Sequence, residues 1–189
     1  MLNVSSKAPY HICTASIIAA LGIAMISISS LNSSSAMLPS ATFAAAEQQQ
    51  KFIAKMTGSE EVPRKNTKAT GTAEFILGQD GKTLSYKISV KDIHGVTTAN
   101  IHNGSKGENG PAVATLFRSR TGSPLLGFLI ENIPISGVLS EGTITSSNLQ
   151  GPLKGKQLSD LVNIMKDGQA FANIRTKQNP RGEIRGQIS

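Results

Sequence analysis

The sequence predicts an all-β fold, an antiparallel β-sandwich or Greek-key barrel with one short α-helix, preceded by an N-terminal hydrophobic targeting helix. Three observations support this prediction. Short apolar segments with a period of two recur along the chain after residue 50, as expected of half-buried strands. The 189 residues include 18 glycines and only 16% are charged, a composition that suits turns and strands better than long surface helices. Only one segment has a clear helical period.

The N-terminus has the features of a membrane-targeting segment. Lys7 precedes an uncharged run of mostly Ile, Ala, Leu and Ser over residues 12–31. Small residues before Glu47 predict signal-peptidase cleavage after Ala46, which divides the chain into a targeting region, 1–46, and an exported domain, 47–189. Alternatively, the run remains as a membrane anchor, since about 20 residues span about 30 Å of hydrocarbon. Both interpretations predict a secreted protein or one at the extracytoplasmic face of the membrane.

The exported domain is expected to depend on a packed core for its stability. The only cysteine, Cys13, lies in the hydrophobic run, so the domain has no disulfide, zinc-thiolate site or thiol nucleophile. Its strands are predicted from apolar alternation, clearest from Leu84 to Val90, and from turn signals such as Asp80-Gly81. The predicted strands are Lys51–Met56, Gly71–Leu77, Leu84–Val90, Val96–His102, Ala112–Phe117, Leu126–Glu131, Thr143–Leu149, Ala170–Thr176 and Glu183–Ile188.

Residues 156–166 interrupt this pattern with a helical one. Leu158, Leu161, Val162 and Met165 fall at i, i+3, i+4 and i+7, which places them on one stripe of a helix. Gly168 stands where a C-terminal glycine would end it. We expect this helix to cover one open side or end of the sheets.

The remaining residues give little sign of catalysis, and we expect no enzyme, no cofactor and no metal. His94 and His102 are the only histidines of the domain, and Asn100 occupies the position that a His-x-His strand site would need. The serines lack a Gly-x-Ser-x-Gly elbow. Glu60 and Glu61 are adjacent, and adjacent side chains in an extended loop point in opposite directions, so they form no catalytic dyad.

The formal net charge of +7 raises the question of acidic partners. Most of the basic residues are single lysines on the polar faces of strands, and the domain has few aromatic residues. A nucleic-acid surface needs exposed aromatic side chains between basic ones, so no nucleic acid is expected. A soluble, positively charged face is the favoured interpretation, and weak attraction to an anionic surface polymer is the alternative.

The C-terminal segment reads as a hairpin with Asn179-Pro180-Arg181-Gly182 as its turn. In its last strand, Glu183, Arg185 and Gln187 share one face, so the two opposite charges can pair with each other or across to Asn173 and Arg175. We interpret these groups as a polar ladder that fixes strand register, in preference to a ligand site.

Several of these segments together resemble the CHRD domain, named after chordin, which also occurs as single exported copies in microbes. The resemblance covers nearly all of residues 51–189. The segments that carry it are Phe52 to Pro63, Gly71-Thr72-Ala73, Ala99-Asn100-Ile101-His102-Asn103-Gly104, Asn109-Gly110-Pro111, Asn173-Ile174-Arg175-Thr176 and Asn179 to Ile188.

The resemblance also bears on a metal site. The family has His-Ile-His where this chain has Asn100-Ile101-His102, and Asn-Val-His-Thr where it has Asn173-Ile174-Arg175-Thr176. The histidine-bearing strands of the family invite comparison with copper-zinc superoxide dismutase, but only His102 remains here. The candidate residues for an interaction or a polar ladder are His102, Asn173, Arg175, Thr176, Glu183 and Arg185.

The targeting segment, the lack of catalytic motifs and the family resemblance together predict a non-enzymatic interaction module outside the cytoplasm. Its partner would be an extracytoplasmic protein or an anionic surface polymer, with membrane contact only through an uncleaved N-terminal segment. One alternative is a metal-binding or redox-active domain that uses His102 with Asn100, Asn173 or Arg175. Another is a structural component of an envelope or matrix.

Overall fold

The computed structural model describes residues 49–120 and 133–189. The predicted targeting helix, the cleavage site after Ala46 and the predicted strand Leu126–Glu131 lie outside these residues. Among the described residues, no helix has the length and apolar character needed to cross a membrane.

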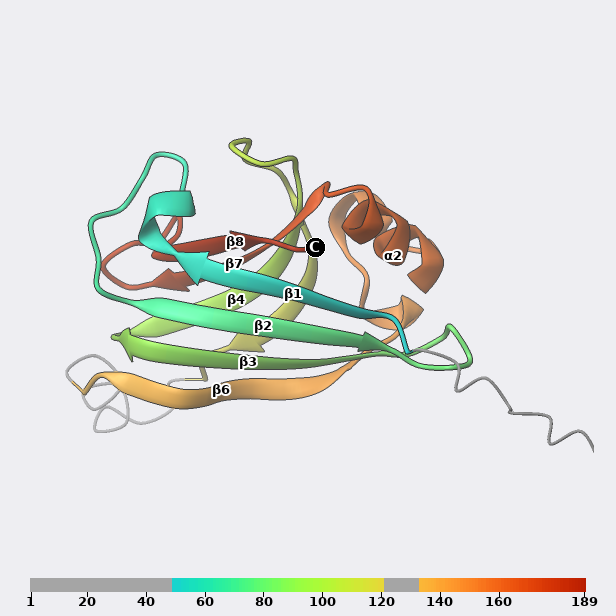
Figure 1. Cartoon of the computed structure of the whole chain (residues 1–189), viewed down its shortest axis with the longest axis horizontal. Helices are drawn as coiled ribbons and strands as arrows, with labels where there is room; N and C mark the ends of the chain where they lie inside the picture. Colours follow the sequence, from blue (N-terminus) through green and yellow to red (C-terminus); the bar gives the residue numbers. More distant parts are fainter. Residues whose placement is uncertain (1–48, 121–132) are drawn as a thin grey trace, which may run out of the picture. The chain divides into compact units, whose positions relative to one another are not determined.

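Eight strands form one sheet in the order β5-β4-β7-β8-β1-β2-β3-β6, and every paired neighbour is antiparallel. The sheet curves into a nearly closed barrel, with β1, β2, β3 and β6 in front of β4, β7 and β8 in Figure 1. The strands are β1 (Lys51–Thr57), β2 (Thr70–Leu77), β3 (Leu84–Ile93), β4 (Val96–Asn103), β5 (Ala112–Arg118), β6 (Ile135–Ile144), β7 (Ala170–Thr176) and β8 (Ile184–Gln187).

The two edge strands, β5 and β6, approach each other through side chains. The hydroxyl of Tyr86 on β3 donates to the carbonyl oxygen of Leu116 on β5 at 2.7 Å, and the Ser140 hydroxyl on β6 donates to the same oxygen at 2.9 Å. These bonds use a carbonyl that faces outward from an edge strand, where it would otherwise remain available for another strand. Over residues 49–120 and 133–189, the predicted antiparallel β-structure with one short α-helix is confirmed.

The core follows the period of two read from the sequence. On β3, Leu84, Ile88 and Val90 are buried inside the barrel, while Ser85 and Lys87 are exposed. Each buried aliphatic side chain of this size contributes about 1.5 to 3 kcal/mol through removal from water. The barrel interior is thus an aliphatic core closed on itself.

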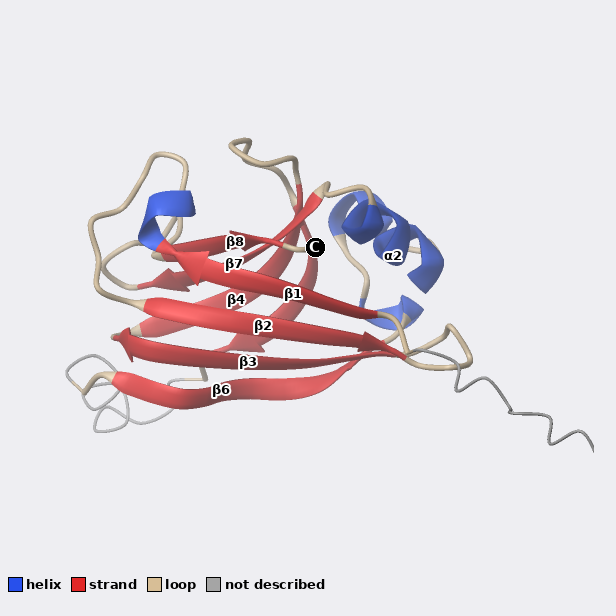
Figure 2. Ribbon diagram, viewed as in Figure 1, coloured by secondary structure: helices blue, strands red, loops and turns tan. Residues whose placement is uncertain are grey.

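The helix α2 (Leu158–Lys166) lies beside one end of the barrel, opposite the short 3-10 helix η1 (Gly58–Glu60) in Figure 2. Its buried residues are the predicted stripe Leu158, Leu161, Val162 and Met165. The helix begins where the Gln157 backbone N–H donates to the Asp160 carboxylate at 2.9 Å, and Gly168 follows it with φ +66°.

The prediction of a strand over Thr143–Leu149 was wrong. The strand β6 runs earlier, over Ile135–Ile144, and two 3-10 helices follow it, η2 (Ser146–Asn148) and η3 (Gly151–Leu153). Most of β6 is exposed, and Gly137 and Gly142 interrupt it, so it lacks the apolar alternation of a half-buried strand. The apolar ends Ile144 and Leu149 are buried, which explains the mistaken assignment.

Candidate functional site

Polar side chains cover the outer face of β4, β7 and β8. Strand pairing places Asn100, Asn173 and Arg185 in one row across the three strands, and His102, Phe171 and Gln187 in the next. These residues alternate with core residues such as Ile101 and Ile174, so they point away from the barrel interior. We call this set, together with Arg175, the polar face.

Three loops fold over the polar face and bury it. Asn109 of the β4–β5 loop donates to the Val62 carbonyl oxygen at 3.0 Å, which links that loop to the segment after η1. Arg185 donates to the Ser105 carbonyl oxygen of the β4–β5 loop at 2.9 Å. The β7–β8 turn supplies the third cover. As a result His102 and Asn173 are only 4% and 3% exposed, although they lie outside the barrel.

His102 is held in one tautomer. Its Nδ1 lies 2.7 Å from the Gly110 carbonyl oxygen, which can only accept, so Nδ1 carries the proton. Burial lowers the pKa of the imidazole, and the nearby Arg175 and Arg185 add to this effect against the raising effect of the Gly110 hydrogen bond. The ring is therefore neutral near pH 7, and Nε2 presents a lone pair.

An aromatic and cationic stack supports this imidazole. His102 stacks on Phe171 with the ring centroids 5.0 Å apart and the planes at 11°. The Arg185 guanidinium carbon lies 3.5 Å from the centroid of the same Phe171 ring. Because β7 lies between β4 and β8, Phe171 separates the imidazole from the guanidinium.

A buried carboxyl, Glu61, belongs to the same cluster and was missed by the sequence reasoning. Its Oε1 accepts from Asn173 Nδ2 at 2.7 Å. Burial raises its pKa from 4.5 to about 7, although the positive charges of Arg185, Lys65 and Arg175 oppose the rise. Gly182 must be small here, because a Cβ atom at this position would clash with the Glu61 carboxyl and the Asn173 amide.

The expectation that Glu60 and Glu61 point in opposite directions agrees with the structure, but Glu61 is not an ordinary loop residue. Glu60 lies near Lys106, with 3.7 Å between carboxylate oxygen and ammonium nitrogen, at the surface. Glu61 is buried. The sequence signal for this carboxyl was the pair Arg175 and Arg185, which lie on neighbouring strands of the β7–β8 hairpin. Two cations that become buried there need an acidic partner.

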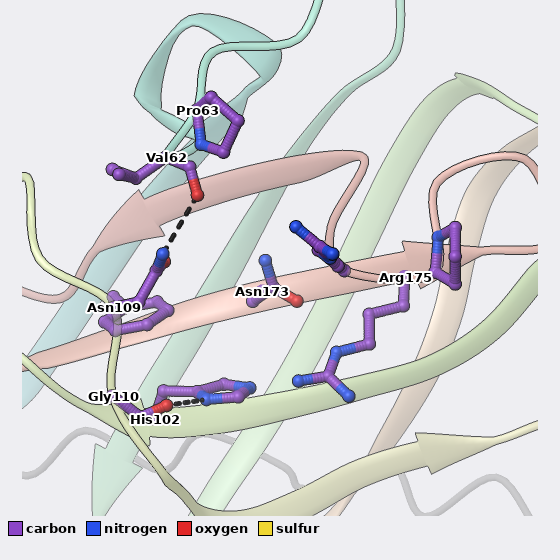
Figure 3. Close-up of a pocket in the computed structure, with 10 residues that line it drawn as sticks. Val62, Pro63, His102, Asn109, Gly110, Asn173 and Arg175 are labelled. Atoms are coloured by element: carbon purple, nitrogen blue, oxygen red, sulfur yellow. Dashed lines mark hydrogen bonds between the residues drawn. The ribbon is translucent and has the colours of Figure 1, made fainter.

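A pocket of about 300 Å³ opens between the polar face and the three loops. Figure 3 shows His102, Asn173 and Arg175 reaching into it from β4 and β7. Its apolar walls are Val62, Pro63, Phe171 and Pro180, and its other polar lining residues include Asn109 and Arg181.

Three buried atoms of the lining residues have no hydrogen-bond partner among the described residues. These atoms are His102 Nε2, Asn173 Oδ1 and Arg175 Nε. An unpaired buried polar group costs about 1 to 3 kcal/mol, so three such atoms on residues that line one pocket are a cost that polar atoms from outside the chain would reduce.

Glu183 forms a separate network beside the pocket. Its carboxylate accepts from Thr67 Oγ1 at 2.5 Å, from Thr176 Oγ1 at 3.1 Å and from the Asn179 side-chain amide. These bonds tie the loop before β2 and the β7–β8 turn together. The possible pairing of Glu183 with Arg185 does not occur: the ion pairs among the described residues include none between them, because Arg185 turns toward Phe171 and Ser105.

The structure thus divides the predicted candidates into two groups. His102, Asn173 and Arg175 line the pocket, with Arg185 packed beside them, whereas Thr176 and Glu183 belong to the neighbouring network. Asn100 lies in the same row as Asn173, but its Oδ1 already accepts from Thr115 at 3.1 Å. The exposed His94 does not line the pocket.

The pocket offers binding chemistry more than reaction chemistry. His102 Nε2 can accept a proton or a hydrogen bond, and Arg175 and Arg181 can donate, but no hydroxyl or thiol nucleophile is among the lining residues. Within residues 49–120 and 133–189, no three His, Cys, Asp or Glu side chains gather as a metal site would require.

Comparison with known proteins gives one match. The family model described as the CHRD domain matches residues 52–188, which include every residue of the pocket. No curated protein and no solved structure matches the chain.

Proposed function

Because the chain belongs to the CHRD domain family, we propose that it is an exported, non-enzymatic binding module that holds an extracytoplasmic partner at the pocket of its polar face. The observation that carries the proposal is that three residues lining one pocket, His102, Asn173 and Arg175, each carry a buried polar atom without a partner. A scaffold that served only to fix strand register would gain by pairing these atoms internally.

Charge supports a partner with acidic character. Arg175 and Arg181 line the pocket, and no Asp or Glu is among its described lining residues. Arginine presents several donors in a fixed plane and is suited to bind carboxylates and phosphates. The domain therefore favours an acidic protein segment or an anionic surface polymer as its partner.

Export is the second part of the proposal, and it rests on the hydrophobic run and small-residue site of residues 12–46. Cell fractionation with N-terminal sequencing of the mature chain tests it. A mature N-terminus at Glu47 in the extracellular or envelope fraction supports cleavage, and an intact N-terminus in the membrane fraction supports the anchor. A cytoplasmic chain with an intact N-terminus contradicts the proposal.

Binding is tested with the purified full-length chain against the polymer and protein fractions of the cell envelope. The test variant is Arg175→Gln, and the matched control is Lys91→Gln, which removes the same charge from an exposed position of β3. We expect retention of the wild type and of Lys91→Gln, with loss for Arg175→Gln at an unchanged melting temperature. Equal retention of both variants would contradict a role of the pocket, and self-assembly without any retained fraction would indicate a structural component instead.

A metal-binding domain is a second candidate, because His102 is neutral and two residues that line the pocket carry unpartnered acceptor atoms, His102 Nε2 and Asn173 Oδ1. Both atoms are capable ligands for a borderline metal ion. Metal analysis of the purified chain and of His102→Ala separates the candidates. Stoichiometric copper or zinc that is lost in His102→Ala would favour this candidate over the binding module.

A further inference from the structure

The donor or acceptor character of each unpartnered atom indicates which ligand groups can bond to it. His102 Nε2 is an acceptor, because Nδ1 holds the proton that is donated to Gly110. Asn173 Oδ1 is an acceptor, because its Nδ2 donates to Glu61. Arg175 Nε is a donor. The pocket therefore needs a ligand that donates at two points and accepts at a third.

This pattern disfavours the simplest ligands. A polyanion unit without protons, such as an internal unit of polyphosphate, can only accept at its oxygens, so it would leave the lone pairs of His102 Nε2 and Asn173 Oδ1 without a donor. An ammonium group or metal cation would satisfy both acceptors but would lie beside Arg175 and Arg181 with no carboxylate among the described lining residues. Hydroxyl groups both donate and accept, so neighbouring hydroxyls on one ring match His102 and Asn173.

The two arginines add a requirement for negative charge on the same ligand. A carboxylate next to the hydroxyls can accept from the Arg175 guanidinium and reach the exposed Arg181 at the rim. Val62, Pro63 and Pro180 supply apolar walls for the C–H edges of a ring. A pocket of about 300 Å³ is at the small end of ligand sites and accommodates one ring of a longer chain.

We propose that the pocket binds one uronic acid residue of an acidic polysaccharide, with its hydroxyls donating to His102 Nε2 and Asn173 Oδ1 and its carboxylate paired with Arg175. This inference rests on the proposed binding function and names its partner as a polymer in place of a protein. The pocket is partly open to solvent, as binding one residue of a longer glycan chain requires.

The test is titration calorimetry of the full-length chain with three probes: trigalacturonate, its fully methyl-esterified form, and polyphosphate. The ester keeps the hydroxyls and loses the charge, and polyphosphate keeps charge and loses the donors. We expect trigalacturonate to bind about tenfold or more tightly than the methyl ester or polyphosphate, since each of these two lacks one set of the matched contacts. Polyphosphate that binds as tightly as trigalacturonate would overturn the inference.

Variants locate the contacts. Arg175→Lys keeps the charge but loses Nε and the planar donor set, so we expect about tenfold weaker trigalacturonate binding. His102→Phe keeps the stack on Phe171 and loses the acceptor, with a similar expected loss, and Lys91→Gln serves as the control. Unchanged binding by both pocket variants, each checked for an unchanged melting temperature, would overturn the inference.

The outcomes also separate this inference from the proposed function. Suppose that the chain binds none of the three probes but is retained by an envelope protein fraction, and that Arg175→Gln abolishes this retention. That result would support the binding module and refute a uronic acid as its ligand. A chain that binds neither the probes nor any envelope fraction contradicts both.

Discussion

The two halves of the barrel wall carry polar side chains on their outer faces, but only one half buries them. On β1, β2 and β3 the outward residues, such as Lys55, Thr72 and Ser89, form a row across the strands and remain at the surface. On β4, β7 and β8 the equivalent row is Asn100, Asn173 and Arg185, and loops cover it. The same strand pattern thus produces a solvated surface on one side and a second, polar interior on the other.

This difference in burial determines how much each polar group contributes to the stability of the fold. An exposed side chain exchanges its contacts with water at little cost, so its replacement changes stability by about 0.5 kcal/mol or less. A buried polar group has lost its water, and its partners within the chain or in a ligand must replace those contacts. Removal of a group that is bonded within the chain should therefore destabilise the covered half far more than the exposed half.

The largest effect is expected for Arg185→Ala. The change removes the guanidinium over Phe171 and the bond to Ser105, and it takes away a cation that opposes the raised pKa of Glu61. We expect the free energy of unfolding to fall by about 3 to 5 kcal/mol in urea denaturation. The matched change Lys87→Ala, at an exposed position of β3, should alter the free energy of unfolding by no more than about 0.5 kcal/mol. Similar losses for both would refute the distinction between the two halves.

A pH-dependent effect is expected for Glu61→Gln. Because the pKa of Glu61 rises from 4.5 to about 7 on folding, the folded chain retains a proton that the unfolded chain has released between these values. Stability from this group therefore falls as pH rises from about 4.5 to about 7, by about 3 kcal/mol in total, and is constant above.

Glu61→Gln removes this loss while keeping an oxygen that accepts from Asn173. Thermal or urea unfolding at pH 5 and pH 8 should show the variant gaining stability over the wild type by about 2 to 3 kcal/mol at the higher pH. His102 has the opposite slope, since its lowered pKa makes its stabilisation fall as pH drops below about 6.5, but it cancels in the comparison. A variant that is less stable than the wild type at pH 8 would show that Glu61 is held as a carboxylate.

A smaller effect is expected for Glu183→Ala. Its loss leaves Thr67, Thr176 and Asn179 without their shared acceptor, and we expect about 2 kcal/mol of destabilisation. The matched change is Glu74→Ala, which removes an exposed ion pair with Lys51 at 3.4 Å and should cost less than about 0.5 kcal/mol. Should Glu183→Ala unfold at the same urea concentration as Glu74→Ala, the Glu183 network would have no structural role.

The sequence allowed the barrel strands with an apolar inner face to be predicted, since alternation in segments such as Leu84 to Val90 reports directly on burial. It also allowed α2 to be predicted, since its stripe and Gly168 are local signals. The exposed edge strand β6 had no such signal, because Gly137 and Gly142 interrupt it and its side chains face water on most positions.

The site was less accessible to prediction. The pattern placed Asn173, Arg175 and Arg185 on the polar face of the C-terminal hairpin, which was correct for direction but gave no sign of burial. Burial arises from the loops that carry Glu61, Ser105 and Asn109, far apart in the chain from the strands they cover. Such long-range covering leaves no periodic pattern, so a polar strand face and a buried polar site look the same in one sequence.

The covered polar face is, on the view proposed here, a ligand site and not only a scaffold for the strands β4, β7 and β8. A crystal structure of the full-length chain grown with saturating trigalacturonate tests it most directly. We expect a sugar ring in the pocket with hydroxyl oxygens within about 3.2 Å of His102 Nε2 and Asn173 Oδ1 and its carboxylate at Arg175. Ordered water bonded to those two atoms, with no sugar in the pocket, would contradict it.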